Sequence, residues 1–178
     1  MDTPSCTERT PLIDAIEPDA VRENFRTGLS HFGSGIVIVT SIDDDGSPIG
    51  MTVGSFTSIS MEPPLVGFFA AHTSTTLPRV LARNAFCANV LAEPQHGIAR
   101  AFARSGADKF NGVDWTPGID GAPRLAGAHA WIDCRLEHSS AYGDHDLVVG
   151  AVGALVVPGE SEPLLFHRSV FHGLRETR

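Results

Sequence analysis

The sequence predicts a mainly β protein: an antiparallel β-barrel with short helices attached. Apolar, β-branched runs recur along the chain between turn residues and add up to about seven strands. Only a few segments carry apolar residues at helical spacing, and each of them is short. Many short strands and few helices are typical of a barrel whose helices lie outside or at its ends.

Length and charge limit the possible functions. A chain of 178 residues, 42% of them hydrophobic, corresponds to one domain with a buried core. The formal net charge is −8, and Lys109 is the only lysine, so no polycationic surface for nucleic acid is available. A phosphate ligand would need a local cluster of arginines or backbone N–H groups.

Other classes are excluded by motifs that are missing from the sequence. No apolar run approaches the roughly 20 residues of a membrane span, and the N-terminus lacks a basic start and an apolar segment, so we expect a cytoplasmic protein. Cys87 and Cys134 lie in apolar patterns and are expected to be buried free thiols, with Cys6 as the third cysteine. Neither H-E-x-x-H nor paired C-x-x-C occurs, so no metal site is expected.

The N-terminal part divides into an arm and a helix. Residues 1–18 are polar and contain prolines, which predicts a flexible arm, and residues 19–175 form the predicted domain. Pro18 and Asp19 start a helix in which Val21, Phe25 and Leu29 recur four apart. We expect this helix to pack on a sheet as a lid.

A hairpin follows. Gly35 to Ser41 is rich in β-branched residues, the turn Asp43 to Gly46 is acidic, and apolar character resumes at Ile49. The turn lacks the spaced ligands and closing glutamate of a calcium loop, which favours a solvated turn. Next come a buried strand over Leu65 to Ala70 and a helix over Ser74 to Asn84.

The second half of the chain continues the β pattern. The predicted elements are strands at Phe86 to Leu91, Ala128 to Leu136, Leu147 to Val157, Leu164 to His167 and Val170 to Leu174, a short helix at Ile98 to Arg104, a long loop from Gly106 to Pro123, and a polar hairpin tip from His138 to Asp146. A loop of that length in a compact domain is usually functional or poorly ordered.

The stretch from Pro48 to Thr76 has the composition of a binding surface. It is rich in Ser and Thr hydroxyls, and Glu62 is its only carboxylate, which suits a planar, polar, anionic ligand better than a hydrolytic reaction. Ser74 to Thr76 precede a helix, whose free N–H groups can cradle an anion. An ordinary helix cap explains the same residues, and both interpretations stay open.

Chemistry motifs exclude several reactions. No G-x-S-x-G elbow or nucleophile-like cysteine occurs, so hydrolysis is poorly supported. The Rossmann fingerprint G-x-G-x-x-G is absent, so a dinucleotide must bind in another geometry. Among the histidines we single out His145, because the turn Gly143-Asp144 places it at the mouth of the predicted barrel.

Several stretches, in order, resemble the flavin reductase family, the FMN-binding split-barrel reductases of two-component flavin-dependent monooxygenases. They are F-R-x-x-L-x-x-F-x-x-G-I-V-I-V-T (Phe25 to Thr40), G-M-T-V-G-S-F-T-S-I-S-M-E-P-P-L-V (Gly50 to Val66), S-T-T (Ser74 to Thr76), F-x-x-N-V-L (Phe86 to Leu91), K-F-x-G-V-D-W (Lys109 to Trp115) and G-D-H (Gly143 to His145). The resemblance covers about Asp19 to Leu174.

The resemblance implies a homodimeric split β-barrel with the flavin near the subunit interface. The implied contacts are Gly50, Met51, Thr52, Ser55 and Phe56 at the flavin ring, Ala70 and Ala71 at the ribityl chain, Ser74, Thr75 and Thr76 at the phosphate, Phe102, Lys109 and Phe110 at the distal phosphate or adenine of FAD, and His145 at the nicotinamide. Gly54 departs from the family, because many relatives carry Asn or Gln there, so any side-chain contact with the flavin ring from that position is lost here.

The implied activity is NAD(P)H-dependent reduction of FMN or FAD, which supplies reduced flavin to a separate monooxygenase. The cofactors carry such a reaction, so a site without an evident acid or base is expected. A non-turnover flavin- or haem-binding split-barrel protein is the alternative, and a pyridoxine-phosphate-type oxidase is a third possibility. NADH is preferred to NADPH only weakly, because Arg100 and Arg104 could serve a 2′-phosphate or simply solvate a helix.

Overall fold

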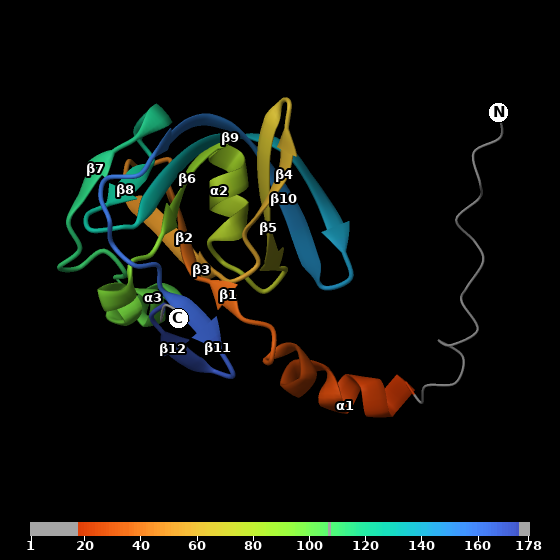
Figure 1. The fold of residues 1–178 in the computed structure, drawn as a ribbon. Helices are drawn as coiled ribbons and strands as arrows, with labels where there is room; N and C mark the ends of the chain where they lie inside the picture. Colours follow the sequence, from red (N-terminus) through yellow and green to blue (C-terminus); the bar gives the residue numbers. More distant parts are fainter. Residues whose placement is uncertain (1–17, 107, 175–178) are drawn as a thin grey trace.

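The computed structural model describes residues 18–106 and 108–174 of the protein (Figure 1). Its helices and strands are α1 (Pro18–Leu29), β1 (Ser34–Gly35), β2 (Val37–Ile42), β3 (Pro48–Val53), β4 (Thr57–Met61), β5 (Pro64–Ala71), α2 (Leu77–Arg83), β6 (Ala85–Val90), η1 (Glu93–Gln95), α3 (His96–Phe102), β7 (Trp115–Pro117), η2 (Ile119–Gly121), β8 (Pro123–Leu125), β9 (Ala130–Tyr142), β10 (His145–Val156), β11 (Leu165–His167) and β12 (Val170–His172). The expected flexible arm lies almost wholly outside the described residues.

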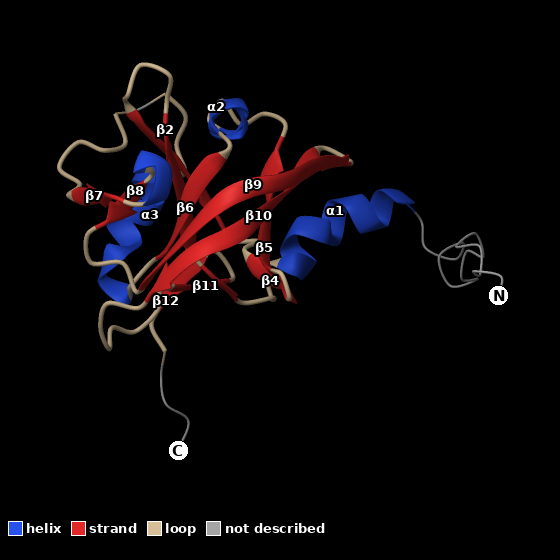
Figure 2. Cartoon of the chain, turned by 90° about the horizontal axis from the view of Figure 1, so that it is seen from above, coloured by secondary structure: helices blue, strands red, loops and turns tan. Residues whose placement is uncertain are grey.

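One antiparallel sheet organises the molecule. Its seven strands run in the order β3-β2-β6-β9-β10-β5-β4, and every pairing is antiparallel. The sheet curls around a common core, as Figures 1 and 2 show. β3 and β4 stand at its two edges, so the barrel is split between them. The predicted mainly β fold of split-barrel type is confirmed.

The sheet is apolar on both faces near its middle. In β2, Val37 and Val39 pack into the core inside the barrel, while Ile38 and the preceding Ile36 pack into a second core on the outer side. A strand that is buried on both faces reads as a continuous apolar run, which explains the sequence Gly35 to Ser41.

Two short helices complete these cores. Leu77 and Val80 of α2 lie in the core inside the barrel, so α2 closes an open end of the sheet. Ala99 and Phe102 of α3 lie in the outer core. Both helices were predicted. Among the described residues, no helix has the length and apolarity that crossing a lipid bilayer would require.

Helix α1 was predicted correctly, but its predicted packing was wrong. It projects from the barrel instead of lying on a sheet (Figures 1 and 2). Its apolar stripe is open to solvent, with Val21 43%, Phe25 60% and Leu29 57% exposed. Periodicity predicts an apolar stripe, but it does not say which surface covers that stripe.

Three local predictions need correction. The stretch Gly106 to Pro123 is not all loop, because it contains β7, which pairs with β8. The hairpin tip is much shorter than predicted, since β9 continues to Tyr142 and β10 starts at His145. β4 was not predicted because its residues are polar. It forms an edge of the sheet and is largely exposed, so burial did not require apolar residues there.

A buried polar cluster joins the strands beneath β8. Asp133 is 1% exposed and accepts a hydrogen bond of 3.0 Å from Nε of Arg124. The Asn89 amide donates to the carbonyl of Ile38 and accepts from the N–H of Leu125. The amide of Asn89 is paired at both its nitrogen and its oxygen, whereas the carboxylate of Asp133 is paired through Oδ2 and its Oδ1 has no hydrogen-bond partner among the described residues.

Cys87 and Cys134 are buried free thiols, as predicted. Burial raises the pKa of both, with that of Cys134 at about 12, and neighbouring Asp133 adds to the effect. Neither thiol is therefore a reactive nucleophile at neutral pH. Cys6 lies outside the described residues.

Candidate functional site

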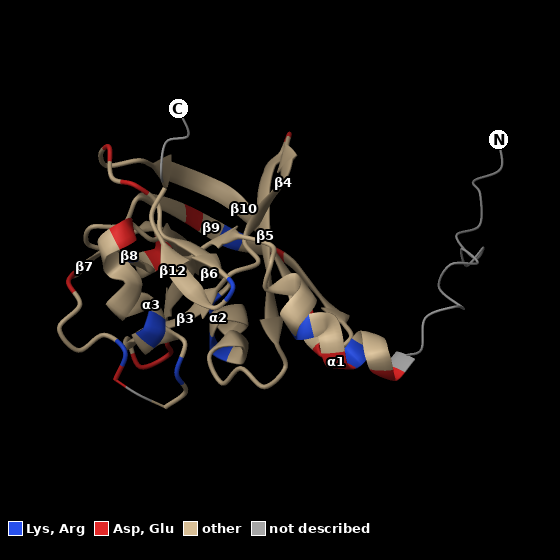
Figure 3. Cartoon of the chain, turned by 60° about the horizontal axis from the view of Figure 1, so that its bottom comes forward, with Lys and Arg blue, Asp and Glu red and all other residues tan. Residues whose placement is uncertain are grey.

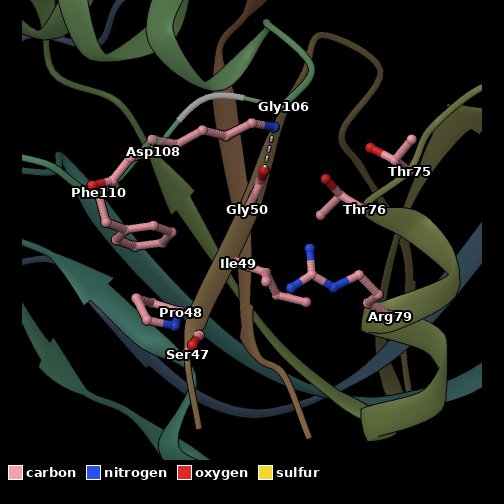
Figure 4. Close-up of a pocket in the computed structure, with 11 residues that line it drawn as sticks. Ser47, Pro48, Ile49, Gly50, Thr75, Thr76, Arg79, Gly106, Asp108 and Phe110 are labelled. Carbon is pink, nitrogen blue, oxygen red and sulfur yellow. Dashed lines mark hydrogen bonds between the residues drawn. The ribbon is translucent and has the colours of Figure 1, made fainter. Parts of the chain in front are cut away.

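A pocket of about 370 Å³ lies between β3, the start of α2 and the segment that follows α3. Figure 4 shows Thr75, Thr76 and Arg79 facing Gly50 and Ile49 across it. The pocket is lined by Ser47, Pro48, Ile49, Gly50, Thr75, Thr76, Arg79, Gly106, Asp108, Lys109 and Phe110. Its size is in the usual range for small-molecule sites.

Lys109 supplies one positive charge to this pocket. Its Nζ donates hydrogen bonds to the backbone carbonyls of Gly50, at 2.9 Å, and Phe102, at 3.2 Å. An ammonium group has three donors, so one remains for a ligand. Burial lowers the pKa of Lys109, and the charge of Arg79 lowers it further. A half-buried lysine held by two carbonyls is a directed anion contact.

Arg79, in the first turn of α2, supplies the second charge. Its Nε donates to Oδ2 of Asp43 at 2.9 Å, and this bond is the main cause of the lowered pKa of Asp43. The acidic turn between β2 and β3 thus anchors a pocket cation as well as being solvated. This contact joins residues 36 positions apart, so sequence spacing did not reveal it.

Two roles were considered for the hydroxyls before α2: a helix cap and an anion cradle. Ser74 Oγ accepts the N–H groups of Leu77, at 3.1 Å, and Thr76, at 3.3 Å, so Ser74 caps the helix. Thr75 and Thr76 instead line the pocket. Ser74 therefore serves the helix start, whereas anion binding stays a prediction for Thr75 and Thr76.

Gly50 allows the chain after α3 to approach β3. A Cβ at Gly50 would lie 2.7 Å from Cε1 of Phe102 and 3.1 Å from the carbonyl oxygen of Val39. Phe102 is only 1% exposed and packs edge-on against Phe110, with their ring centroids 4.9 Å apart. Phe110 lines the pocket, and the buried ring of Phe102 packs against the ring of Phe110.

The predicted ring-binding residues bond mostly to the protein itself. The Thr52 hydroxyl donates to the carbonyl of Ala99 at 2.8 Å. Ser55 Oγ accepts the Phe69 N–H at 2.9 Å and donates to its carbonyl at 3.1 Å, which ties the loop after β3 to β5. The side chain of Met51 is in the core, and Phe56 packs against it. Backbone is therefore the main surface that this stretch offers a ligand.

The two alanines at the end of β5 face opposite sides of the sheet. Ala70 is 5% exposed and packs in the core inside the barrel. Ala71 is half-buried and pairs with His145 across the strands. Only Ala71 therefore brings its side chain to the outer surface, in the segment that leads to Thr75.

His145 opens β10 at the short turn. Its Nδ1 lies 2.6 Å from Oδ1 of Asp144, and this contact is the main cause of the lowered pKa of Asp144. Nε2 is left for a ligand. Asp146, the residue after His145, forms a second pair: its Oδ1 lies 3.4 Å from Nε2 of His72. The sequence did not predict this pair. His72 directly follows β5, two residues beyond the end of the predicted strand Leu65 to Ala70, and that position was the only signal for it.

The pocket has the chemistry of a phosphate site. Lys109 and Arg79 provide positive charge, and Thr75 and Thr76 provide hydroxyls, within a chain of net charge −8. This donor set fits the phosphate end of a flavin nucleotide, with the backbone of β3 beside it. His145 is not among the lining residues; the segment from Ala71 to Thr75 connects it to them.

Comparisons with known proteins agree on one family. Residues 29–175 match the family model of the flavin reductase like domain. The chain is 42% identical to a flavin reductase of Pseudomonas putida over 149 residues, which are 84% of this chain and 88% of the relative. It is also 42% identical over 161 residues to the reductase subunit of a flavin-dependent monooxygenase of Rhodococcus jostii, covering 90% of this chain and 80% of the relative.

A solved structure extends this similarity to the fold. An NADH:FAD oxidoreductase of Streptomyces globisporus, in complex with NAD and FAD fragments, superposes with a TM-score of 0.83 at 33% identity. The match covers 90% of this chain and 96% of that one.

Proposed function

The chain belongs to the flavin reductase like domain family, and we propose that it is an NAD(P)H:flavin oxidoreductase that supplies reduced flavin to a separate monooxygenase. The observation that carries the proposal is the pocket beside β3, where Lys109 and Arg79 meet two threonine hydroxyls. The catalytic unit is one domain, residues 19–175. Reduced flavin leaves it by diffusion.

The flavin lies along β3 in this proposal. Its phosphate is held by Lys109, Arg79 and the hydroxyls of Thr75 and Thr76, and the backbone of Gly50 to Phe56 faces its ring. Ser74 acts by capping α2. When both cofactors are bound, a hydride passes from the nicotinamide to N5 of the flavin, so the protein has to position two rings and balance charge.

His145 is the residue proposed to act at the nicotinamide. Asp144 accepts from Nδ1–H and so fixes the ring, which leaves Nε2 to accept from the carboxamide N–H when the imidazole is neutral, or to donate to the reduced flavin when it is protonated. Such a contact stabilises charge that develops in the transition state. FMN and FAD both fit the proposed phosphate contacts, with Phe110 and Lys109 also available to the distal part of FAD, and NADH is the proposed donor.

The active protein is proposed to be a homodimer. The stripe of α1 formed by Val21, Phe25 and Leu29 has no apolar partner within the described protomer. Phe69 and Tyr142, on the outer face of the sheet, are also exposed and form an aromatic pair with centroids 6.3 Å apart. Exposed apolar surface of this kind is typical of a subunit interface. A second copy would bring such an interface close to His145.

The turnover test mixes purified protein, NADH and a large excess of FMN or FAD, and follows NADH absorbance in air and without oxygen. The expected result is oxidation proportional to protein and saturable in flavin under both conditions. Tight, coloured flavin binding with no turnover under either condition would instead support the alternative, a flavin-binding protein.

Replacing Lys109 by Met should weaken FMN binding about 10-fold, the size of one lost charge-assisted hydrogen bond. Fluorescence titration measures it, and Arg83→Gln on the exposed side of α2 is the matched control. Riboflavin, which lacks the phosphate, should bind the variant as well as it binds the wild type. If the variant binds FMN as tightly as the wild type does, Lys109 does not contact the phosphate.

The same titration has an expected pH dependence. Lys109 is charged only below its pKa, which burial lowers, so FMN affinity should fall as pH rises towards that pKa and should stay flat in the Met variant.

Replacing His145 by Ala should lower kcat/KM for NADH about 10-fold while leaving the FMN dissociation constant unchanged, because the contact is made to the nicotinamide. His138→Ala, also exposed on this hairpin, is the control. Steady-state NADH kinetics equal to those of the wild type would end the proposed role of His145.

The dimer proposal predicts a solution mass of twice 18.9 kDa by sedimentation. Phe25→Asp should shift the protein towards monomer, because it places a charge in the apolar stripe. Thr27→Asp, on another face of α1, should leave the mass unchanged. A monomeric wild-type protein at micromolar concentration would refute the proposal.

A further inference from the structure

A second cavity, of about 570 Å³, lies on the outer side of β3 between α3 and the hairpin of β11 and β12. Figure 1 shows these elements side by side, and Figure 3 shows the same region from below. The cavity is lined by Ile36, Thr52, Gly54, Ala99, Arg100, Ala103, Phe166, Ser169 and Phe171. The flavin phosphate pocket shares none of these residues.

The lining combines flat apolar surface with one cation. Phe166 and Phe171 lie with ring centroids 5.1 Å apart, and the guanidinium of Arg100 lies 5.4 Å from the centroid of Phe171. No acidic residue lines the cavity, although the chain has a net charge of −8. Within residues 18–106 and 108–174, Arg79, Arg83, Arg124 and Arg135 form ion pairs and Arg100 does not.

A ligand for this cavity should carry a planar, mostly apolar ring next to an anionic group. Aromatic side chains stack on a purine, and a guanidinium binds phosphate oxygens through paired N–H donors. The Ser169 hydroxyl also lines the cavity. Adenosine diphosphate has this combination of ring, ribose and phosphates, whereas a nicotinamide ring alone lacks the charge.

We propose that this cavity binds the adenosine diphosphate part of the nicotinamide dinucleotide, with adenine against Phe166 and Phe171 and the pyrophosphate on Arg100. This inference rests on the proposed reductase function. Thr52 and Gly54 belong both to this cavity and to the stretch proposed to face the flavin ring. A dinucleotide anchored here therefore reaches the flavin with its nicotinamide end.

FAD contains adenosine diphosphate as well, but the pocket beside Gly50 is already the proposed site for flavin phosphates. Lys109 and Arg79 lie in the other pocket, and neither of them lines this cavity. The two cavities border different positions of β3, Gly50 in one and Thr52 with Gly54 in the other. Separate anchors on one strand allow two nucleotides to bind together.

The test compares NADH with reduced nicotinamide mononucleotide, which lacks the adenosine phosphate. Arg100→Gln should raise KM for NADH about 10-fold, because a charge-assisted hydrogen bond to phosphate is lost. KM for the mononucleotide and kcat should stay within about twofold of the wild-type values, as should the dissociation constants of FMN and FAD. Arg104→Gln removes the same charge just beyond α3, outside the cavity, and should change none of these.

A second variant tests the cavity without removing Arg100, so that a local folding effect of the Arg100 substitution can be recognised. Ala103→Trp fills the cavity from α3 and should raise KM for NADH without changing FMN binding or the melting temperature. An unchanged KM for NADH in both variants would overturn the inference, and so would a loss of FAD affinity in place of NADH affinity. If the wild-type protein oxidises no NADH with either flavin, the proposed function itself fails, which is a different result.

Discussion

The contact between Gly50 and Phe102 is the constraint on which the candidate site depends. Because Gly50 has no side chain, the Phe102 ring can pack directly on β3, and the chain after α3 crosses the strand there. Lys109 then donates to the carbonyls of these same two residues. Inside the barrel, Ile49 and Met51 bury the other face of β3. A strand packed on both faces is rigid, and both cavities are built against it.

The polar groups of the site are partly engaged before any ligand arrives. Lys109 is bonded to two carbonyls and Arg79 to Asp43. If a phosphate binds there as proposed, both cations still have hydrogen-bond partners after it leaves, because Lys109 keeps its two carbonyls and Arg79 keeps Asp43. Such an arrangement suits a flavin that must dissociate after reduction. The hydroxyls of Thr52 and Ser55 are likewise satisfied by backbone groups, which holds β3 and β5 in place.

In the proposed function, different residues serve binding and chemistry. Its cations and hydroxyls gather where a phosphate would lie, and His145 stands on another pair of strands, oriented by Asp144. No strongly perturbed acid or base is needed between them, because the two cofactors exchange the hydride themselves. Tyr142 pairs with His145 across β9 and β10 and forms an exposed aromatic pair with Phe69, so an apolar surface borders the proposed nicotinamide site.

The sequence by itself determined the fold class, most helices and strands, and the segments that meet at the site, because alternating apolar residues and local turn and cap signals are short-range properties. It pointed to Thr75 and Thr76 through the helix-start pattern, and to Lys109 as a binding residue only through a family resemblance. Tertiary structure alone decided that Arg79 is held by Asp43, that Phe102 is a buried support beneath Gly50, and that Arg100 faces an aromatic cavity. These contacts join residues far apart in the chain, and no local pattern encodes which distant surfaces meet. The open stripe of α1 has the same cause: periodicity defines an apolar face, but it does not say which surface covers that face.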